Sequence, residues 1–128
     1  MNLKINFIEH MSYFDGIKMK MEGVIMKIVG VTACTIGLAH TYMAATALKD
    51  AAKKKGYSIK IETQGSLGVK DKLDERDISE ADVVILACDT KIKDSERFKD
   101  KKCLEVKVSS AVKEPGNVID KALELINE

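Results

Sequence analysis

The chain has 128 residues, of which 45% are hydrophobic and 32% charged, a size and balance typical of one compact domain. Its 21 basic and 20 acidic side chains give a formal net charge of +1, which excludes a global field that would attract nucleic acid or an anionic membrane. The longest apolar run, residues 83–88, is far shorter than the ~20 residues of a membrane-spanning helix, so we expect no membrane span.

Three cysteines, Cys34, Cys88 and Cys103, are an odd number and lack C-x-x-C spacing. This argues against a disulfide framework and against a zinc site, and it favours a reducing cytoplasm. Cys88 and Cys103 lie in or beside apolar strands, so we expect them to be buried structural thiols. A redox pairing of either with Cys34 is the alternative.

Residues 1–25 differ from the rest, because they hold four of the six methionines and two of the three phenylalanines. They lack the basic start, apolar centre and cleavage site of a secretory signal. A strand pattern begins at Met26, and codons for Met21-Glu22-Gly23 can contain a ribosome-binding sequence. We therefore expect an N-terminal extension over 1–25, disordered or a start-site artefact, and a domain over 26–128. The alternative is an amphipathic helical arm that presents Phe7, Ile8, Met11 and Phe14.

Residues 27–68 show the patterns of a strand, a helix, a second strand and a loop. Residues 27–33 are mostly apolar or β-branched, which predicts a central strand covered on both faces. Alanine-rich residues 38–55 predict a helix, with three lysines at its C-terminal dipole end and Gly56 as its stop. Residues 57–63 alternate as a half-covered or edge strand does, and the two glycines of 64–68 predict a loop.

The second half continues the alternation. Residues 74–82 predict a short helical or irregular stretch, 83–88 a buried strand, 89–102 a solvated connection and 102–108 a fourth strand. Pro115 opens a final helix with one apolar face. Parallel neighbours need crossover connections, so this order predicts an α/β fold. We expect an open four-stranded parallel sheet with helices on both faces, Rossmann-like or flavodoxin-like, in strand order 2-1-3-4.

Cys34 ends the first strand, where the chain turns into the first helix. Open α/β sheets bind ligands at the carboxyl ends of their strands. Free N–H groups and the dipole of a helix N-terminus favour an anion there, whether a phosphate or the nucleophilic thiolate. Simple burial of the thiol is the alternative.

The loop "CTIGLAHT" is a candidate phosphate cradle, made of Thr35, Ile36, Gly37, Leu38, Ala39, His40 and Thr41. Its spacing is similar to the Cys-x5-Arg loop of low-molecular-weight tyrosine phosphatases, but His40 stands in place of the arginine. Histidine cannot grip a phosphoryl group bidentately, so the loop favours holding that group and passing it on over hydrolysis. Alternatively, His40 supports or caps the helix locally.

The stretch "ACTIGLAHTYMAA" resembles the phosphocysteine loop of the fructose-type enzyme IIB components of the bacterial phosphoenolpyruvate-dependent sugar phosphotransferase system. The family pattern is C-P-T-G-I-A-H-T-Y/F-M-A-A. Similarity continues through "IKIETQGSLG", "ISEADVVILACDTKIKDSERF" and "KVSSAVKEP", and so covers residues 26–128. Within the loop, Thr35 and Ile36 replace the usual proline and threonine, which removes one fixed φ and one hydroxyl donor.

The resemblance implies that Cys34 accepts a phosphoryl group from phosphohistidine of a IIA protein. It then passes the group to fructose, or a fructose-like sugar, bound by the membrane IIC permease. The resemblance also implies a cytoplasmic location at the inner face of the membrane, through IIC. No cofactor, metal or nucleotide is called for. Gln64 and Gly65 follow the second strand and either border the site or form a plain turn.

Other functions and surfaces stay open. The rival activity is a cysteine phosphatase or an arsenate-reductase-like enzyme, and a third is a regulatory module that takes phosphate but serves no permease. Residues 91–102 form a solvated connection or, with Arg97 and Phe98, a docking patch. The apolar side chains of Ile36, Leu38 and Tyr42 serve docking, packing or both.

Overall fold

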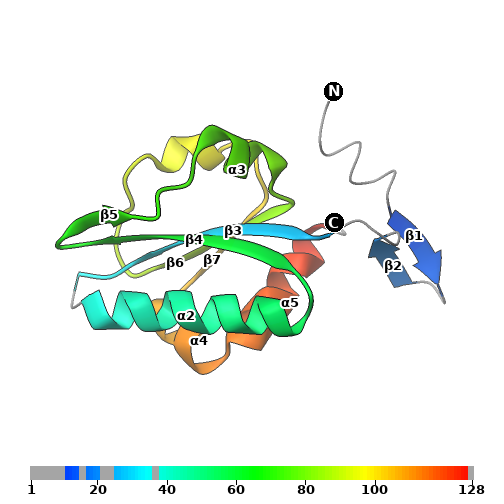
Figure 1. Ribbon diagram of the computed structural model, residues 1–128, viewed down its shortest axis with the longest axis horizontal. Helices are drawn as coiled ribbons and strands as arrows, with labels where there is room; N and C mark the ends of the chain where they lie inside the picture. Colours follow the sequence, from blue (N-terminus) through cyan, green and yellow to red (C-terminus); the bar gives the residue numbers. More distant parts are fainter. Residues whose placement is uncertain (1–10, 15–16, 21–24, 36–37, 127–128) are drawn as a thin grey trace.

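The computed structural model of the chain describes residues 11–14, 17–20, 25–35 and 38–126. Its centre is a five-stranded sheet in the order β5-β4-β3-β6-β7 (Figure 1). Four of these strands are parallel: β3 (Lys27–Ala33), β4 (Ser58–Gly65), β6 (Val83–Cys88) and β7 (Cys103–Val106). Their order, β4-β3-β6-β7, confirms the predicted 2-1-3-4 arrangement with the strand after Met26 in the interior.

The fifth strand corrects the prediction of an all-parallel sheet. β5 (Gly68–Lys70) pairs antiparallel with the end of β4, so residues 64–68 form a hairpin and not a free loop. Gly68 has a φ of +101°, which a glycine adopts without strain, and the chain can therefore reverse tightly there. Short antiparallel partners of this kind are hard to read from a sequence, because three residues carry too little periodicity.

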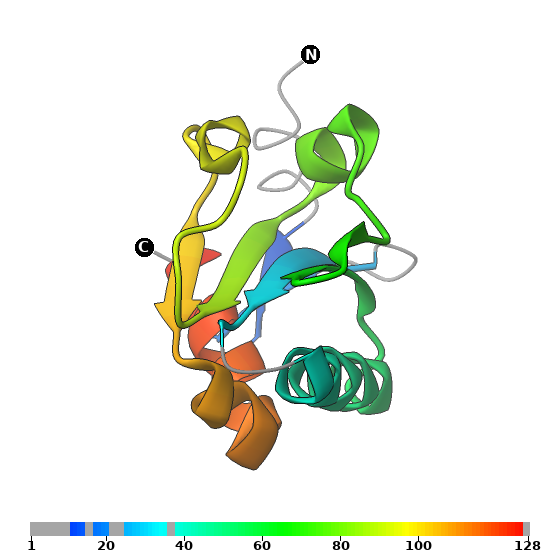
Figure 2. The same cartoon turned by 90° about the vertical axis from the view of Figure 1, so that its left-hand side faces the viewer.

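Helices cover both faces of the sheet, as predicted (Figure 2). One face carries α2 (Leu38–Lys54), α4 (Val108–Lys113) and α5 (Pro115–Ile126), and the other carries α3 (Glu75–Glu80) and the 3-10 helix η1 (Ser95–Phe98). Helix α4 was not predicted, since the fourth strand was expected to continue to Val108 but ends at Val106. The connection expected over 89–102 contains η1.

Alternation along β3 divides the core into two layers. Ile28 packs with the helices α2, α4 and α5, whereas Val29 and Val31 pack with α3 and η1. Successive side chains of a strand point to opposite faces, so a run of apolar residues is what a strand covered on both sides requires. Both layers are apolar, and together they cover the two faces of β3.

Gly30, in the middle of β3, has no room for a side chain. A Cβ atom there would lie 2.8 Å from Ile61 Cδ1 and 2.9 Å from the Ile85 carbonyl oxygen. We expect Gly30→Ala to lower the free energy of unfolding by about 1–3 kcal/mol, measured by urea denaturation. Gly116→Ala is the matched control, because nothing lies within 4 Å of its added Cβ in α5. Equal stability of the two variants would show that the sheet adjusts without cost.

The N-terminal segment contains a separate two-stranded antiparallel sheet, β1 (Met11–Phe14) and β2 (Ile17–Lys20). Met11 and Phe14 therefore lie in a strand, and the alternative of a helical arm is wrong at these two positions; Phe7 and Ile8 lie outside the described residues. The expectation that residues 1–25 are an extension or a start-site artefact stays a prediction.

Candidate active site

Cys34 directly follows β3 at the carboxyl edge of the sheet, the edge that faces the viewer in Figure 2. The strand register pairs Ala33 with Gln64 on one side and with Cys88 on the other, so the segments after β3 and β6 meet the end of β4. Cys34 is 7% exposed. It borders a pocket of about 340 Å³ lined by Ala33, Cys34, Thr35, Gln64, Gly65, Ser66, Thr90, Lys91 and Lys93. The two rim residues suggested by the sequence, Gln64 and Gly65, are thus beside Cys34.

The candidate phosphate loop joins Cys34 to α2. Thr35 is exposed and lines the pocket, and α2 begins at Leu38, so Ala39, His40 and Thr41 form its first turn. Thr41 is buried and Ala39 is exposed. Ile36, Gly37 and the side chain of Leu38 lie outside the described residues. The loop's role as an anion cradle stays a prediction, and the helix N-terminus that it requires is present.

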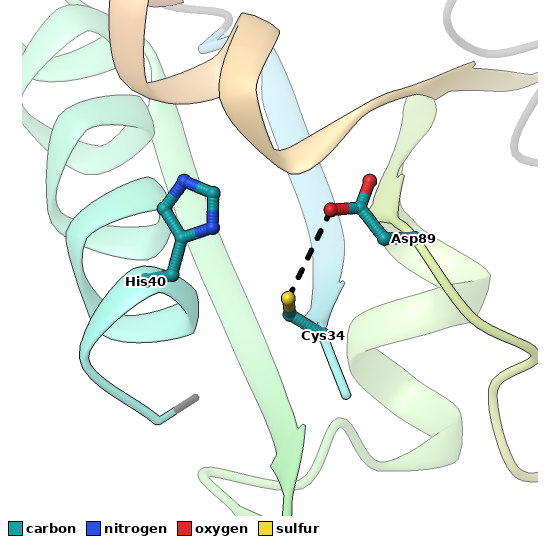
Figure 3. A group of neighbouring side chains, drawn as sticks. All are labelled: Cys34, His40 and Asp89. Atoms are coloured by element: carbon teal, nitrogen blue, oxygen red, sulfur yellow. Dashed lines mark hydrogen bonds between the residues drawn. The ribbon is translucent and has the colours of Figure 1, made fainter. Parts of the chain in front are cut away.

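Asp89 is the neighbour of Cys34 that sequence reasoning missed (Figure 3). The Cys34 thiol donates to Asp89 Oδ2 across 3.8 Å, and Asp89 Oδ1 accepts from the Val108 N–H at 3.1 Å. His40 lies on the other side of the thiol, and the potential ligand atoms of Cys34, His40 and Asp89 all lie within 4.8 Å of one another. Asp89 follows β6 as Cys34 follows β3, so the rule for carboxyl ends of strands could have found it.

A buried carboxylate, Glu62, is hydrogen-bonded to the pocket residue Gln64. Glu62 is 1% exposed, and both of its oxygens accept from the Arg97 guanidinium, at 2.8 and 2.6 Å. It also accepts from Gln64 Nε2 at 2.8 Å and from the Leu73 N–H at 2.9 Å. Desolvation pushes the pKa of Glu62 up, but the bonds from Arg97, Gln64 and Leu73 outweigh it and leave the pKa below its ordinary value.

Gln64 connects this buried network to the rim of the pocket. Its Oε1 accepts from the Lys93 N–H at 2.8 Å, and its Nε2 donates to the Lys93 carbonyl at 3.3 Å. The Gln64 amide thereby holds the segment that carries Lys91 and Lys93 beside Cys34. The positive charges of these two lysines favour an anion bound in the pocket. The suggested docking patch is wrong for Arg97 and Phe98, because Arg97 turns inward to Glu62 and Phe98 is 2% exposed.

Cys88 and Cys103 are partly buried and pack in the layer of α3 and η1, in agreement with a structural role. Desolvation, with a contribution from Asp89, raises the pKa of Cys88 to about 12, and desolvation with Glu105 raises the pKa of Cys103. At pH 8 the thiol of Cys88 therefore stays almost wholly protonated. We therefore expect iodoacetamide to leave Cys88 unmodified in the folded protein, as read by peptide mass spectrometry. Unfolding in urea should expose it to alkylation, and rapid labelling of folded protein would contradict this pKa.

Comparisons with known proteins agree on one family. Residues 29–121 match the family model described as "PTS system, Lactose/Cellobiose specific IIB subunit", where PTS denotes the phosphotransferase system. The chain is 50% identical over 95 residues to the PTS fructose-like EIIB component 2 of Escherichia coli K12, a match that covers 74% of this chain and 90% of that protein.

Two further relatives are parts of longer proteins. The chain is 47% identical over 97 residues to the PTS fructose-specific EIIABC component of Bacillus subtilis, covering 76% of this chain and 15% of that protein. A domain of the fructose-specific IIABC component of Borrelia burgdorferi, solved as a crystal structure, has a TM-score of 0.76 and 46% identity over 79% of this chain and 96% of that domain.

The family model and the relatives name different sugars. The description of the family model refers to lactose and cellobiose. The individual proteins that are 46–50% identical to this chain are instead described as fructose-specific or fructose-like. Within the described part of the chain, no helix is both long enough and apolar enough to cross a membrane. The chain thus belongs to the fructose-type enzyme IIB components of the phosphotransferase system, which transfer phosphoryl groups in sugar uptake.

Proposed function

We propose that Cys34 is the phosphoryl carrier of this component. It accepts the group from phosphohistidine of a IIA protein and passes it to fructose, or a fructose-like sugar, bound by a IIC permease at the cytoplasmic face of the membrane. The observation that carries the proposal is the position of the thiol, between a strand end, a helix N-terminus and a pocket with two lysines in its lining. The fused EIIABC relative supports IIA and IIC partners.

Asp89 is placed to handle the proton in both transfers. In the first, the Sγ–P bond forms as the donor's N–P bond breaks, and the thiol proton passes through Asp89 Oδ2 and water to the departing imidazole. In the second, the sugar hydroxyl oxygen attacks phosphorus and the S–P bond breaks. The hydroxyl proton returns by the same route to Cys34, so each step conserves charge and protons.

The anion-stabilising groups fit transfer better than hydrolysis. The N-terminus of α2 and the pocket lined by Lys91 and Lys93 favour the phosphoryl oxygens. His40 occupies the position of the arginine that, in a phosphatase, would hydrogen-bond the phosphoryl group bidentately in the transition state. Without that arginine, the loop lacks the strongest stabilisation of a hydrolytic transition state, which favours transfer of the phosphoryl group to a second partner.

The test is intact-protein mass spectrometry after incubation with phosphoenolpyruvate, the general phosphotransferase proteins and a fructose-type IIA. We expect one phosphoryl adduct, mapped to Cys34, that membranes with IIC and fructose discharge. An adduct that no permease discharges would indicate the regulatory module instead. Turnover of an aryl phosphate by wild type but not by Cys34→Ala would indicate the phosphatase.

Asp89→Asn separates proton transfer from folding. The amide oxygen can still accept from the Val108 N–H, so the start of α4 is kept, but the carboxylate base is lost. We expect phosphorylation by IIA to slow by about 10²-fold with an unchanged melting temperature. An unchanged rate would remove Asp89 from the proton path.

A further inference from the structure

We propose that Cys34, His40 and Asp89 form a three-ligand site for a thiophilic divalent cation such as Zn²⁺. A cation on the thiolate occupies the sulfur lone pair that would attack phosphorus. Metal binding and phosphorylation of Cys34 therefore exclude each other, an exclusion that rests on the proposed phosphoryl-carrier function.

The spacing of the donor atoms suits such a cation. Zinc lies about 2.3 Å from a thiolate sulfur and about 2.1 Å from a carboxylate oxygen, which places the two ligands about 3.6 Å apart in a tetrahedral site. Cys34 Sγ and Asp89 Oδ2 are 3.8 Å apart. The full set, with one ring nitrogen of the half-buried His40, lies within 4.8 Å, so a small side-chain adjustment brings all three atoms to the spacing of zinc ligands.

Backbone hydrogen bonds and regular elements position the three ligand residues. The second oxygen of Asp89 accepts from the Val108 N–H, and the Asp89 N–H donates to the Ala33 carbonyl at 2.9 Å. Cys34 continues from β3, the central strand, and His40 sits in the first turn of α2. Outer contacts of this kind orient metal ligands and keep the site assembled before the cation arrives.

The charges and the ligand count fit an exchangeable cation. A thiolate and a carboxylate supply two negative charges against the two positive charges of Zn²⁺, and the imidazole adds a neutral donor. Three protein ligands leave a fourth position for water. Cysteine spacing could not reveal this set, because its thiol and carboxylate are 55 positions apart and it contains one cysteine.

The test uses the full chain with its thiols reduced by a phosphine that does not compete for metal. Co²⁺ reports thiolate ligation by a charge-transfer band in the near ultraviolet, and calorimetry with Zn²⁺ gives affinity and stoichiometry. We expect one ion per chain, loss of the Co²⁺ band in Cys34→Ser, and Zn²⁺ affinity at least about tenfold weaker in His40→Gln and in Asp89→Asn. The controls Cys88→Ser and His10→Gln, which change another thiol and the other histidine, should bind as wild type does.

Two outcomes overturn the site: no binding by the wild type, or affinity that is unchanged in both His40→Gln and Asp89→Asn, which would mean a simple thiol adduct. Exclusion is tested with the IIA phosphorylation assay, where one equivalent of Zn²⁺ should prevent the adduct and a chelator should restore it. Full phosphorylation in the presence of bound Zn²⁺ would overturn exclusion. Because metal binding is measured without any phosphotransfer protein, a chain that binds Zn²⁺ but accepts no phosphoryl group when metal-free would refute the proposed function alone.

Discussion

A Cys34→Ser variant is expected to accept phosphoryl groups from IIA at less than about 10⁻³ of the wild-type rate. Serine keeps the shape of the side chain, but its hydroxyl is a far weaker nucleophile at neutral pH than a cysteine thiol. The measurement is the rate of the phosphoryl adduct by intact mass.

Cys103→Ser is the matched control, since Cys103 is a partly buried thiol away from the pocket and changes by the same single atom. It should accept the phosphoryl group at the wild-type rate. Circular dichroism should show that Cys34→Ser melts within a few degrees of wild type. A normal adduct on Cys34→Ser, mapped to another residue, would contradict the assignment of the carrier.

Arg97→Met is expected to destabilise the fold by about 3–5 kcal/mol at pH 7, because it leaves the Glu62 carboxylate buried without its cation. The methionine retains much of the apolar volume, so the loss reflects charge and not a cavity. Urea denaturation gives the free energy. The double variant Glu62→Gln/Arg97→Met should recover part of the loss, since an uncharged amide costs far less to bury than a carboxylate.

The pH dependence of this loss has a definite sign. In the wild type the pKa of folded Glu62 lies below its ordinary value of 4.5, so the network stabilises the fold above that value and the contribution is lost as the pH falls through the folded pKa. Without Arg97, the largest contribution that lowers the pKa of Glu62 is lost while the desolvation stays, so we expect this pKa to rise. The deficit of the variant is therefore greatest near pH 7 and shrinks as Glu62 takes up a proton.

Arg76→Met is the control for this experiment. Arg76 also pairs with a glutamate, Glu80, at 2.9 Å, but its side chain is 84% exposed. Solvent screens such a pair, so we expect no measurable change in the denaturation midpoint. Equal losses in the Arg76 and Arg97 variants would show that burial of Glu62 is not the source of the effect.

The sequence by itself determined the four parallel strands, their order and the position of Cys34 at the end of the first of them. These features rest on local signals: the apolar runs of β3 and β6, the alanine-rich α2 with its stop at Gly56, and the apolar face of α5 after Pro115. The candidate loop is contiguous, so its strand-to-helix placement follows from the flanking elements alone. The β5 hairpin and helix α4 were not predicted, because runs of three and six residues are too short to show a period.

Only the tertiary structure decided which polar side chains meet. Asp89 looked like the first residue of a solvated stretch, yet it reaches the Cys34 thiol, 55 positions away. Arg97 looked like a surface cation, yet it turns inward to Glu62, 35 positions away. The direction of a charged side chain depends on partners that folding brings together from distant segments, and no local periodicity records them.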